Sequence, residues 1–382
     1  MIKRLILACL VGLTLFSTSC RENEVIFLPT PNQVAPPHPN AKVMGFYQLN
    51  EGNMGMNRAS IDFFDIREGV YTTDIYSKAN PSVVKELGDV GNDIRIYGDK
   101  LYAVINCSNK VEVMDRWTCK RIKVINIPNC RYIVFNEGKA YVSSYSGPVE
   151  INPNAEKGFI AEIDTASLEI TRTVGVGYQP EEMVINNGKL YVANSGGYRV
   201  PNYDNTVSVI DLESFTQINK IPVGINLHRM ALDKRGNIFV SSRGDYYDVP
   251  SNLFVIDSHT DLVTDTLGIA ASELHLSGDS LYYYSVEWSY HTNTNNITFG
   301  ILDTRTKEVV NDKIITDGTD KNMMIPYGIA VNPESKDIYI SDAQNYVVTG
   351  YIYCYSAEGK MKWRVEAGNI PGHFTFLTNE TY

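Results

Sequence analysis

The hydrophobic and polar positions of the chain follow one pattern that recurs along most of its length. An apolar strand leads into a turn containing Gly, a second apolar strand ends in a small or polar residue, and a third strand, after a variable loop, ends in Asp. The clearest copy places LYVAN at residues 190–194 and VSVID at residues 207–211. Short apolar runs bounded by Gly, Asn and Asp are typical of β-strands, so the pattern predicts an all-β protein.

The second strand of this pattern recurs seven times, each time with an aromatic residue at its second position. These aromatic residues are Tyr47, Tyr102, Tyr141, Tyr191, Phe239, Tyr282 and Tyr339. The gaps between them run from 39 to 57 residues. Repeats of about 40–50 residues with four short strands each are typical of β-propeller blades, whereas separate β-sandwiches would not repeat one pattern. We therefore predict a single domain over residues 44–382, a seven-bladed β-propeller with four antiparallel strands per blade.

The two ends of this domain are predicted to share one blade. The last inner strand, at residues 373–377, has no second strand after it, and the second strand at residues 46–50 has no inner strand before it. Pairing them closes the ring and removes free sheet edges.

The third strands end in a repeated acceptor side chain. The residues are Asp65, Asp115, Asp164, Asp211, Asp257, Asp303 and, in the last copy, Ser356. Such a side chain accepts a hydrogen bond from the backbone two residues on and fixes the following turn. We therefore expect these groups to be structural and not catalytic.

The first 19 residues resemble a secretory signal peptide. Lys3 and Arg4 precede an apolar run over residues 5–16, which is too short to span a bilayer because a spanning helix needs about 20 residues. The small residues before Cys20 resemble the cleavage box of bacterial lipoproteins, which implies that Cys20 becomes the lipidated first residue. Residues 20–43 contain five prolines, which predict an extended, semi-rigid tether.

Glu22 and Glu24 follow Cys20 and resemble the surface-export signal of lipoproteins in gut Gram-negative bacteria. We expect the protein to be lipid-anchored in the outer membrane, facing the cell exterior, with the lipid as its one contact with the membrane. The 44 acidic residues outnumber the 34 basic ones, giving a formal charge of −10. This balance argues against nucleic acid as a partner, since its binding requires basic patches.

Four cysteines follow Cys20: Cys107, Cys119, Cys130 and Cys354. None forms a CxxC pair, so no zinc site is predicted. The expected compartment permits disulfides, and Cys107 could pair with Cys130 if their loops share a face. Free buried thiols are the alternative.

The chain has 25 Tyr against 13 Phe and 3 Trp, and many tyrosines lie between second and third strands. In a propeller these loops share one face, here called the loop face, with the segments that lead into the inner strands; the other connections form the turn face. The loop aromatics are Tyr145, Tyr198, Tyr203, Tyr246, Tyr247, Trp288, Tyr290 and Tyr346. Such rings stack on flat, partly polar ligands, so sugars, corrin-like macrocycles and protein surfaces all fit. Mutual packing of the loops is the alternative.

A second candidate site is the mouth of the central channel, where the inner strands begin. The matching positions there, strand by strand, are Asn92 and Asp93, Arg131 and Tyr132, Glu181 and Glu182, His228 and Arg229, Ser272 and Glu273, Tyr327 and Gly328, and Gly372 and His373. Polar lining is expected in any wet channel, and the sharper hypothesis is that some of these groups contact a ligand.

No catalytic motif is present: the sequence lacks GxSxG, a Walker loop, HExxH and EF-hand spacing. We therefore expect no enzyme, no metal and no cofactor. His228, His291 and His373 could in principle serve a lyase or ligate a metal, but their spacing does not support either.

The repeated phrases resemble those of a known family. LYVAN, VSVID and VGVGYQP at residues 174–180 are similar to the YVTN-type propellers related to YncE, over about residues 44–377. GFYQLNEGN at 45–53, YISDAQNY at 339–346, GYIYCYSAEGK at 350–360 and NIPGHFTF at 369–376 resemble surface propeller lipoproteins that serve TonB-dependent outer-membrane transporters. The best-defined type, BtuG, captures vitamin B12.

The resemblance implies a surface protein that captures cobalamin or a related corrinoid and passes it to such a transporter. Two alternatives stay open: a glycan-binding lipoprotein of a polysaccharide-uptake system, and a protein-interaction propeller of the outer membrane.

Overall fold

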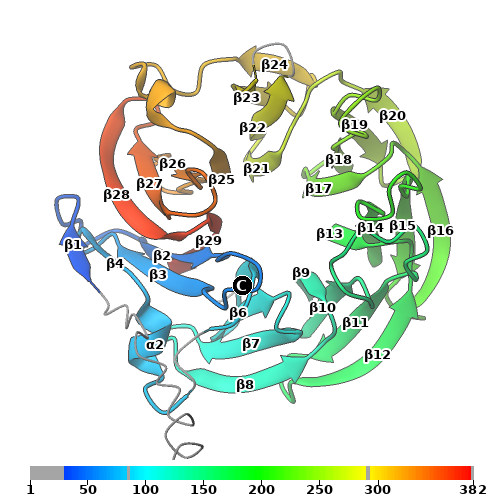
Figure 1. Ribbon diagram of the computed structural model, residues 1–382, viewed down its shortest axis with the longest axis horizontal. Coiled ribbons are helices and arrows are strands. Elements are labelled where there is room, and N and C mark those ends of the chain that lie inside the picture. Colours follow the sequence, from blue (N-terminus) through cyan, green and yellow to red (C-terminus); the bar gives the residue numbers. More distant parts are fainter. Residues whose placement is uncertain (1–29, 84–86, 290–292, 380–382) are drawn as a thin grey trace, which may run out of the picture.

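The computed structural model describes residues 30–83, 87–289 and 293–379. Within these residues the strands form seven antiparallel sheets, arranged as blades around a central axis (Figure 1). The prediction of a seven-bladed β-propeller is confirmed.

Each blade runs from the axis outwards through four strands in the same order. The inner strands are β5 (Gly91–Tyr97), β9 (Cys130–Asn136), β13 (Pro180–Asn186), β17 (Leu227–Leu232), β21 (Glu273–Ser277), β25 (Pro326–Val331) and β29 (Pro371–Thr378). The second strands are β6 (Lys100–Ile105), β10 (Lys139–Ser144), β14 (Lys189–Asn194), β18 (Asn237–Ser242), β22 (Ser280–Ser289), β26 (Ile338–Asp342) and β2 (Val43–Asn50).

The two outer positions complete each blade. The third strands are β7 (Lys110–Asp115), β11 (Phe159–Asp164), β15 (Thr206–Asp211), β19 (Asn252–Asp257), β23 (Thr294–Asp303), β27 (Thr349–Tyr355) and β3 (Ser60–Asp65). The fourth strands are β8 (Arg121–Asn126), β12 (Glu169–Gly175), β16 (Thr216–Pro222), β20 (Leu262–Thr266), β24 (Glu308–Asn311), β28 (Met361–Asn369) and β4 (Val70–Thr72).

The ring closes by pairing strands from the two ends of the described chain. In Figure 1 the red β29 lies beside the blue β2, with Gly45 opposite Leu377 and Leu49 opposite His373. The shared blade was predicted. A fifth strand, β1 (Pro31–Gln33), pairs with β4, so part of the Pro-rich segment lies along the outer edge of this blade.

Within the described residues, two short helical elements lie in the connections between strands. These elements are α2 (Ile75–Ala79) and the 3-10 helix η1 (Thr319–Asn322). Neither reaches the length and apolarity that a helix needs to cross a membrane.

The repeated aromatic residues of the second strands lie between the blades. Tyr102, Tyr191 and Phe239 are fully buried. The Tyr47 hydroxyl donates to the carbonyl of Arg116 in the next blade at 2.6 Å, and the Tyr191 hydroxyl donates to that of Ser258 at 2.9 Å. In these two blades the apolar ring fills the gap between two sheets while the hydroxyl keeps a partner. The buried Tyr102 hydroxyl has no such partner among the described residues, so burial of the ring is what the repeated aromatic position shares.

The recurrent Asp residues close turns, as predicted. Asp115 Oδ1 accepts the backbone N–H of Trp117 at 3.0 Å and of Thr118 at 2.8 Å. Asp164 does the same with the two corresponding residues of its own turn. In the last copy Ser356 Oγ accepts from the backbone of Lys360 at 3.4 Å.

Residues 286–289 and 294–297, which the sequence pattern places in the loop that contains Trp288, are instead paired strand ends. Strands β22 and β23 stay paired as far as Ser289 opposite Thr294. The opposed pair Val286 and Ile297 is β-branched, and such cross-strand pairs extend a sheet. Trp288 therefore projects from a strand.

The disulfide considered for Cys107 and Cys130 is not formed, because all four cysteines in the described residues are free thiols. Cys130 is buried in the core between two blades, where its Sγ lies 3.3 Å from the Lys110 carbonyl oxygen. Cys107 lies on a half-buried turn with its Sγ 3.4 Å from the Asn106 side chain. The Cys107 and Cys130 thiols thus contact different groups and do not contact each other.

Candidate functional site

The inner strands present two consecutive side chains to the channel because most of them contain a β-bulge near their start. The register of β13 shifts between Pro180 and Met183, and that of β17 between Leu227 and Met230. A bulge re-aims the side chains at its position. Glu181 and Glu182 are consecutive residues, and both nevertheless reach the network of charges described below.

Arg131 joins three blades in this network. Its Nη2 lies 3.0 Å from Glu181 Oε2, and its Nη1 donates to Asn92 Oδ1 at 2.5 Å. Burial acts to raise the pKa of Glu181, but the charges of Arg131 and Arg243 hold this pKa below its ordinary value. Glu181 is therefore ionised at neutral pH.

Arg229 is the centre of a second group of contacts in the network. Its Nη1 lies 2.8 Å from Glu182 Oε1 and 2.9 Å from the Tyr132 hydroxyl, and its Nη2 lies 2.7 Å from Glu273 Oε2. Burial raises the pKa of Glu273 to about 7, although the charge of Arg229 opposes the shift. One guanidinium thus links four blades and holds two carboxylates.

His228 is neutral in this arrangement. Its Nε2 lies 2.8 Å from Arg243 Nη2 and 3.1 Å from the Tyr132 hydroxyl. A guanidinium only donates, so Nε2 accepts and the ring proton lies on Nδ1. Burial and the nearby charges of Arg243 and Arg229 hold the pKa of His228 well below its ordinary value.

A second cluster adjoins this network, because the rings of His373 and Tyr132 lie 6.5 Å apart between their centroids. Glu51 Oε1 lies 3.1 Å from His373 Nε2. Glu51 Oε2 accepts a hydrogen bond from the Tyr327 hydroxyl at 2.9 Å. Tyr346 packs edge-on against Tyr327 with ring centroids 5.7 Å apart. A loop aromatic is thus joined to the channel wall.

Asp93 holds the wall together. Its Oδ2 accepts the backbone N–H of Ile133 at 3.1 Å, and its Oδ1 lies 3.0 Å from Arg95 Nε. The hydrogen bond to Ile133 connects β5 to β9, so this predicted ligand contact has structural partners inside the protein.

Tyr145, predicted as an exposed loop aromatic, is only 2% exposed. Its hydroxyl donates to Glu181 Oε1, and the Arg131 guanidinium lies 4.8 Å from its ring centre. Tyr198 packs edge-on against it, with centroids 6.3 Å apart, and is 37% exposed. Tyr145 is buried because it packs against the channel charges of Glu181 and Arg131.

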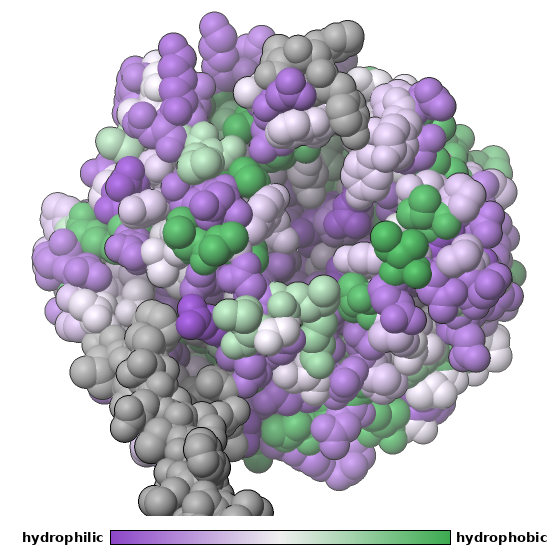
Figure 2. Space-filling model, in the orientation of Figure 1, coloured by the Kyte–Doolittle hydropathy of each residue, from purple (hydrophilic) through white to green (hydrophobic). Residues whose placement is uncertain are grey.

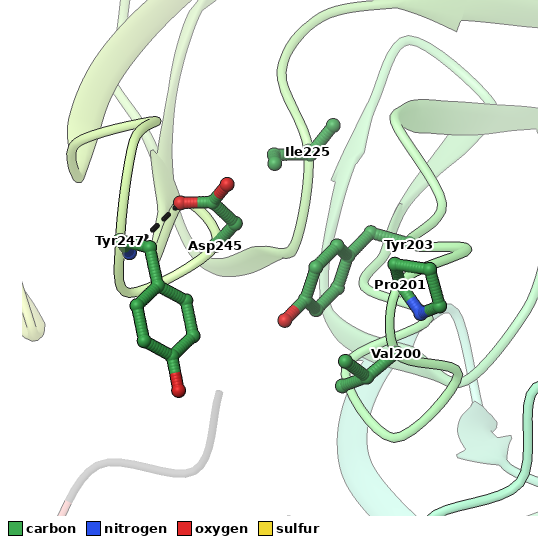
Figure 3. A pocket seen from close by; sticks show the side chains of 6 residues that line it. All are labelled: Val200, Pro201, Tyr203, Ile225, Asp245 and Tyr247. Atoms are coloured by element: carbon green, nitrogen blue, oxygen red, sulfur yellow. Dashed lines mark hydrogen bonds between the residues drawn. The ribbon is translucent and has the colours of Figure 1, made fainter.

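A cleft of about 330 Å³ lies between the loops at residues 195–205 and 243–251 of two neighbouring blades (Figure 3). It is lined by Val200, Pro201, Tyr203, Ile225, Asp245 and Tyr247. The rings of Tyr203 and Tyr247 stand on its two sides. Asp245 Oδ1 accepts the backbone N–H groups of Tyr247 and Val249, which fixes the loop that presents Tyr247, a residue 81% exposed.

The other loop aromatics lie on several blades. Tyr246, Trp288 and Tyr346 are exposed, and Tyr290 lies outside the described residues. Figure 2 shows that one face of the ring is hollowed at its centre, with hydrophilic side chains visible inside the hollow. The structure joins Tyr145, Tyr198 and Tyr346 to the channel network and places Tyr203 with Tyr247 in the cleft.

The predicted site omitted Glu51 and Arg243, whereas Tyr132, Glu181 and Tyr327 were among the matching positions of the inner strands. Glu51, Tyr145 and Arg243 each occupy the first position after the second strand of their blade, and each contacts the channel network. A long polar side chain at that position was the signal that could have identified Glu51 and Arg243.

Within the described residues no group of three or more His, Cys, Asp or Glu side chains is arranged to hold a metal ion. The site offers fixed hydrogen-bond donors and acceptors in a buried ring, next to aromatic surfaces. Such a combination binds amphipathic ligands with polar edges.

Solved structures share the fold at low identity. Hydrazine synthase from Kuenenia stuttgartiensis aligns with a TM-score of 0.60 and 14% identity, covering 76% of this chain and 96% of that chain. A quinonprotein alcohol dehydrogenase-like protein from Bacteroides thetaiotaomicron aligns at 0.57 with 16% identity, covering 87% and 78%. A hypothetical selenium-binding protein from Sulfolobus tokodaii aligns at 0.64 with 12% identity, covering 89% and 96%.

In sequence, no curated protein matches the chain. A family model described as "Domain of unknown function (DUF5074)" matches residues 44–376, which is nearly the whole propeller.

Proposed function

The chain belongs to the DUF5074 family, and from this premise we propose that it is a surface propeller that captures cobalamin or a related corrinoid. The proposal includes a lipid anchor at Cys20, a position facing the cell exterior and delivery of the ligand to a TonB-dependent outer-membrane transporter. The resemblance of GFYQLNEGN and NIPGHFTF to such lipoproteins supports the narrower assignment.

The pairing of an aromatic cleft with a polar channel mouth is the observation on which the proposal rests. A corrinoid is a flat apolar macrocycle edged by amide side chains. Tyr203 and Tyr247 offer ring surfaces beside the cleft, and aromatic side chains bury such a macrocycle with little loss of side-chain entropy. The donors and acceptors of the channel mouth suit amides.

We propose binding and not catalysis because the ionisable groups of the channel already have partners. Glu181 is held by Arg131 and Tyr145. Arg229 is held by Glu182 and Glu273. A fixed polar network of this kind orients a ligand without a covalent step.

Isothermal titration of the mature protein with cyanocobalamin tests the proposal. We expect saturable heat with one ligand per chain at micromolar concentrations. The absence of binding heat at micromolar protein and ligand would contradict the proposal.

Glycan binding is the second candidate, favoured by the open rings of Tyr247 and Trp288, which are 81% and 52% exposed. Exposed aromatic rings provide platforms on which sugar faces stack. A glycan array distinguishes the two: reproducible binding to a glycan, with no response to cyanocobalamin, would replace the corrinoid assignment.

A further inference from the structure

Two arginines of the channel network share one carboxylate, that of Glu181. Arg131 Nη2 lies 3.0 Å from Glu181 Oε2, whereas Arg243 Nη1 lies 3.8 Å from Glu181 Oε1, beyond hydrogen-bonding distance. Arg243 instead donates from Nη2 to His228 Nε2 at 2.8 Å. Because this nitrogen accepts, His228 adds no charge. The four side chains are therefore left with one unbalanced positive charge.

This charge is accessible to a ligand. The Arg243 side chain is 33% exposed, while that of Glu181 is 1% exposed. Arg243 is also the first residue of the loop at 243–251, which presents Asp245 and Tyr247 to the cleft (Figure 3). The excess charge thus lies on the segment that connects the channel mouth with the cleft.

The local balance differs around Arg229. That single guanidinium contacts two carboxylates, Glu182 and Glu273, and is only 7% exposed, so its charge is more than balanced there and is shielded from solvent. Arg243 is the arginine whose charge and N–H groups a ligand can use.

We propose that Arg243 binds a singly charged anionic group of the ligand. In a corrinoid, this group is the phosphodiester that links the nucleotide to the macrocycle. A phosphodiester has one negative charge and two free oxygens, which match a guanidinium fork. This assignment rests on the proposed function. It implies that the protein distinguishes complete corrinoids from cobinamides, which lack the phosphodiester.

The test compares cyanocobalamin with dicyanocobinamide by isothermal titration, using the mature wild type and three variants. Charge-assisted hydrogen bonds of this kind change affinity by about tenfold or more. The wild type should prefer cyanocobalamin by about that factor. Arg243→Gln should lose the preference by weakening cyanocobalamin alone, and Arg243→Lys, which retains the charge, should keep part of it. Arg305→Gln removes an exposed arginine paired with Asp303 on the turn face and should change neither affinity.

Equal affinity of the wild type for both corrinoids would overturn the inference, as would equal weakening of both in Arg243→Gln. If the wild type bound neither corrinoid, the proposed function would fail. Binding of diethyl phosphate would then test the anion site at Arg243 independently of the proposed function. Its phosphorus NMR line should broaden with the wild type and Arg243→Lys and stay narrow with Arg243→Gln; broadening that is the same in all three would contradict the site. Unchanged thermal unfolding of the variants provides the folding control.

Discussion

The turn face and the loop face of the ring are built from connections of different kinds. On the turn face, short turns repeat one device, in which a strand-terminal carboxylate such as Asp115 or Asp164 accepts backbone N–H groups. On the loop face the connections differ from blade to blade, and the first residue after the second strand is variously Glu51, Tyr145 or Arg243. Where the pattern is kept, the residues stabilise the fold; where it is broken, they form the candidate site.

The tyrosines make the same distinction within one residue type. Tyr191 is fully buried between blades and bonded to Ser258, whereas Tyr247 projects from the loop face beside the cleft. Tyr145 belongs to neither group, because it lies in a loop but is buried against Glu181 and Arg131.

Replacing these tyrosines with Ala should separate the two groups most strongly. Tyr191→Ala creates a cavity between two blades, which should reduce stability by about 3–5 kcal/mol. Tyr247→Ala should change stability by under about 0.5 kcal/mol, as is usual for exposed positions. Urea unfolding followed by tryptophan fluorescence measures both. Similar losses in the two variants would remove the distinction between strand and loop tyrosines.

A smaller effect is expected from the channel carboxylate Glu273. The pKa of Glu273 in the folded protein, about 7, lies above its ordinary value of 4.5. The folded protein therefore retains a proton that the unfolded chain releases, and stability from this group is lost as pH rises through 7.

The variant Glu273→Gln abolishes this titration. Between about pH 5 and about pH 8, the wild type should lose stability relative to the variant. The comparison must be with the variant because His228, with its lowered pKa, contributes the opposite slope to both proteins. Parallel urea midpoints across this range would show that Glu273 does not titrate there.

The smallest effect is expected on the turn face. Asp115→Ala removes the acceptor for the backbone N–H groups of Trp117 and Thr118, which should cost about 1 kcal/mol of stability. Ligand affinity should not change. Asp248→Ala, at an exposed position of the loop face, is the matched control and should be nearly neutral in urea unfolding.

Sequence reasoning predicted the parts of the fold that repeat. The aromatic at the second position and the Asp after the third strand each recur for a local physical reason, and together they gave the number of blades and the shared closing blade. The hairpin of β22 and β23 was missed because the pattern in the other blades suggested a loop where Val286 and Ile297 extend the sheet.

The site was predicted less completely because its contacts cross between blades. Arg131, Tyr132 and Arg229 were identified from their register, but the hydrogen bond from Arg229 to Tyr132 became apparent only in three dimensions. The same is true of Arg243, which bonds His228. The burial of Tyr145 likewise depends on Glu181 in the adjacent blade. Register along a strand predicts which residues face the channel, and only the ring geometry predicts which of them meet.

The central claim, that the loop face binds a corrinoid and the turn face does not, is tested most directly by titrating cyanocobalamin into three proteins. These are the wild type, the cleft double variant Tyr203→Ala and Tyr247→Ala, and Trp117→Ala, which removes an exposed aromatic from the turn face. The account predicts that the double variant loses about 2 kcal/mol of binding free energy or more, about 30-fold in affinity, and that Trp117→Ala binds like the wild type. Equal affinity in all three proteins, or a loss confined to Trp117→Ala, would contradict it.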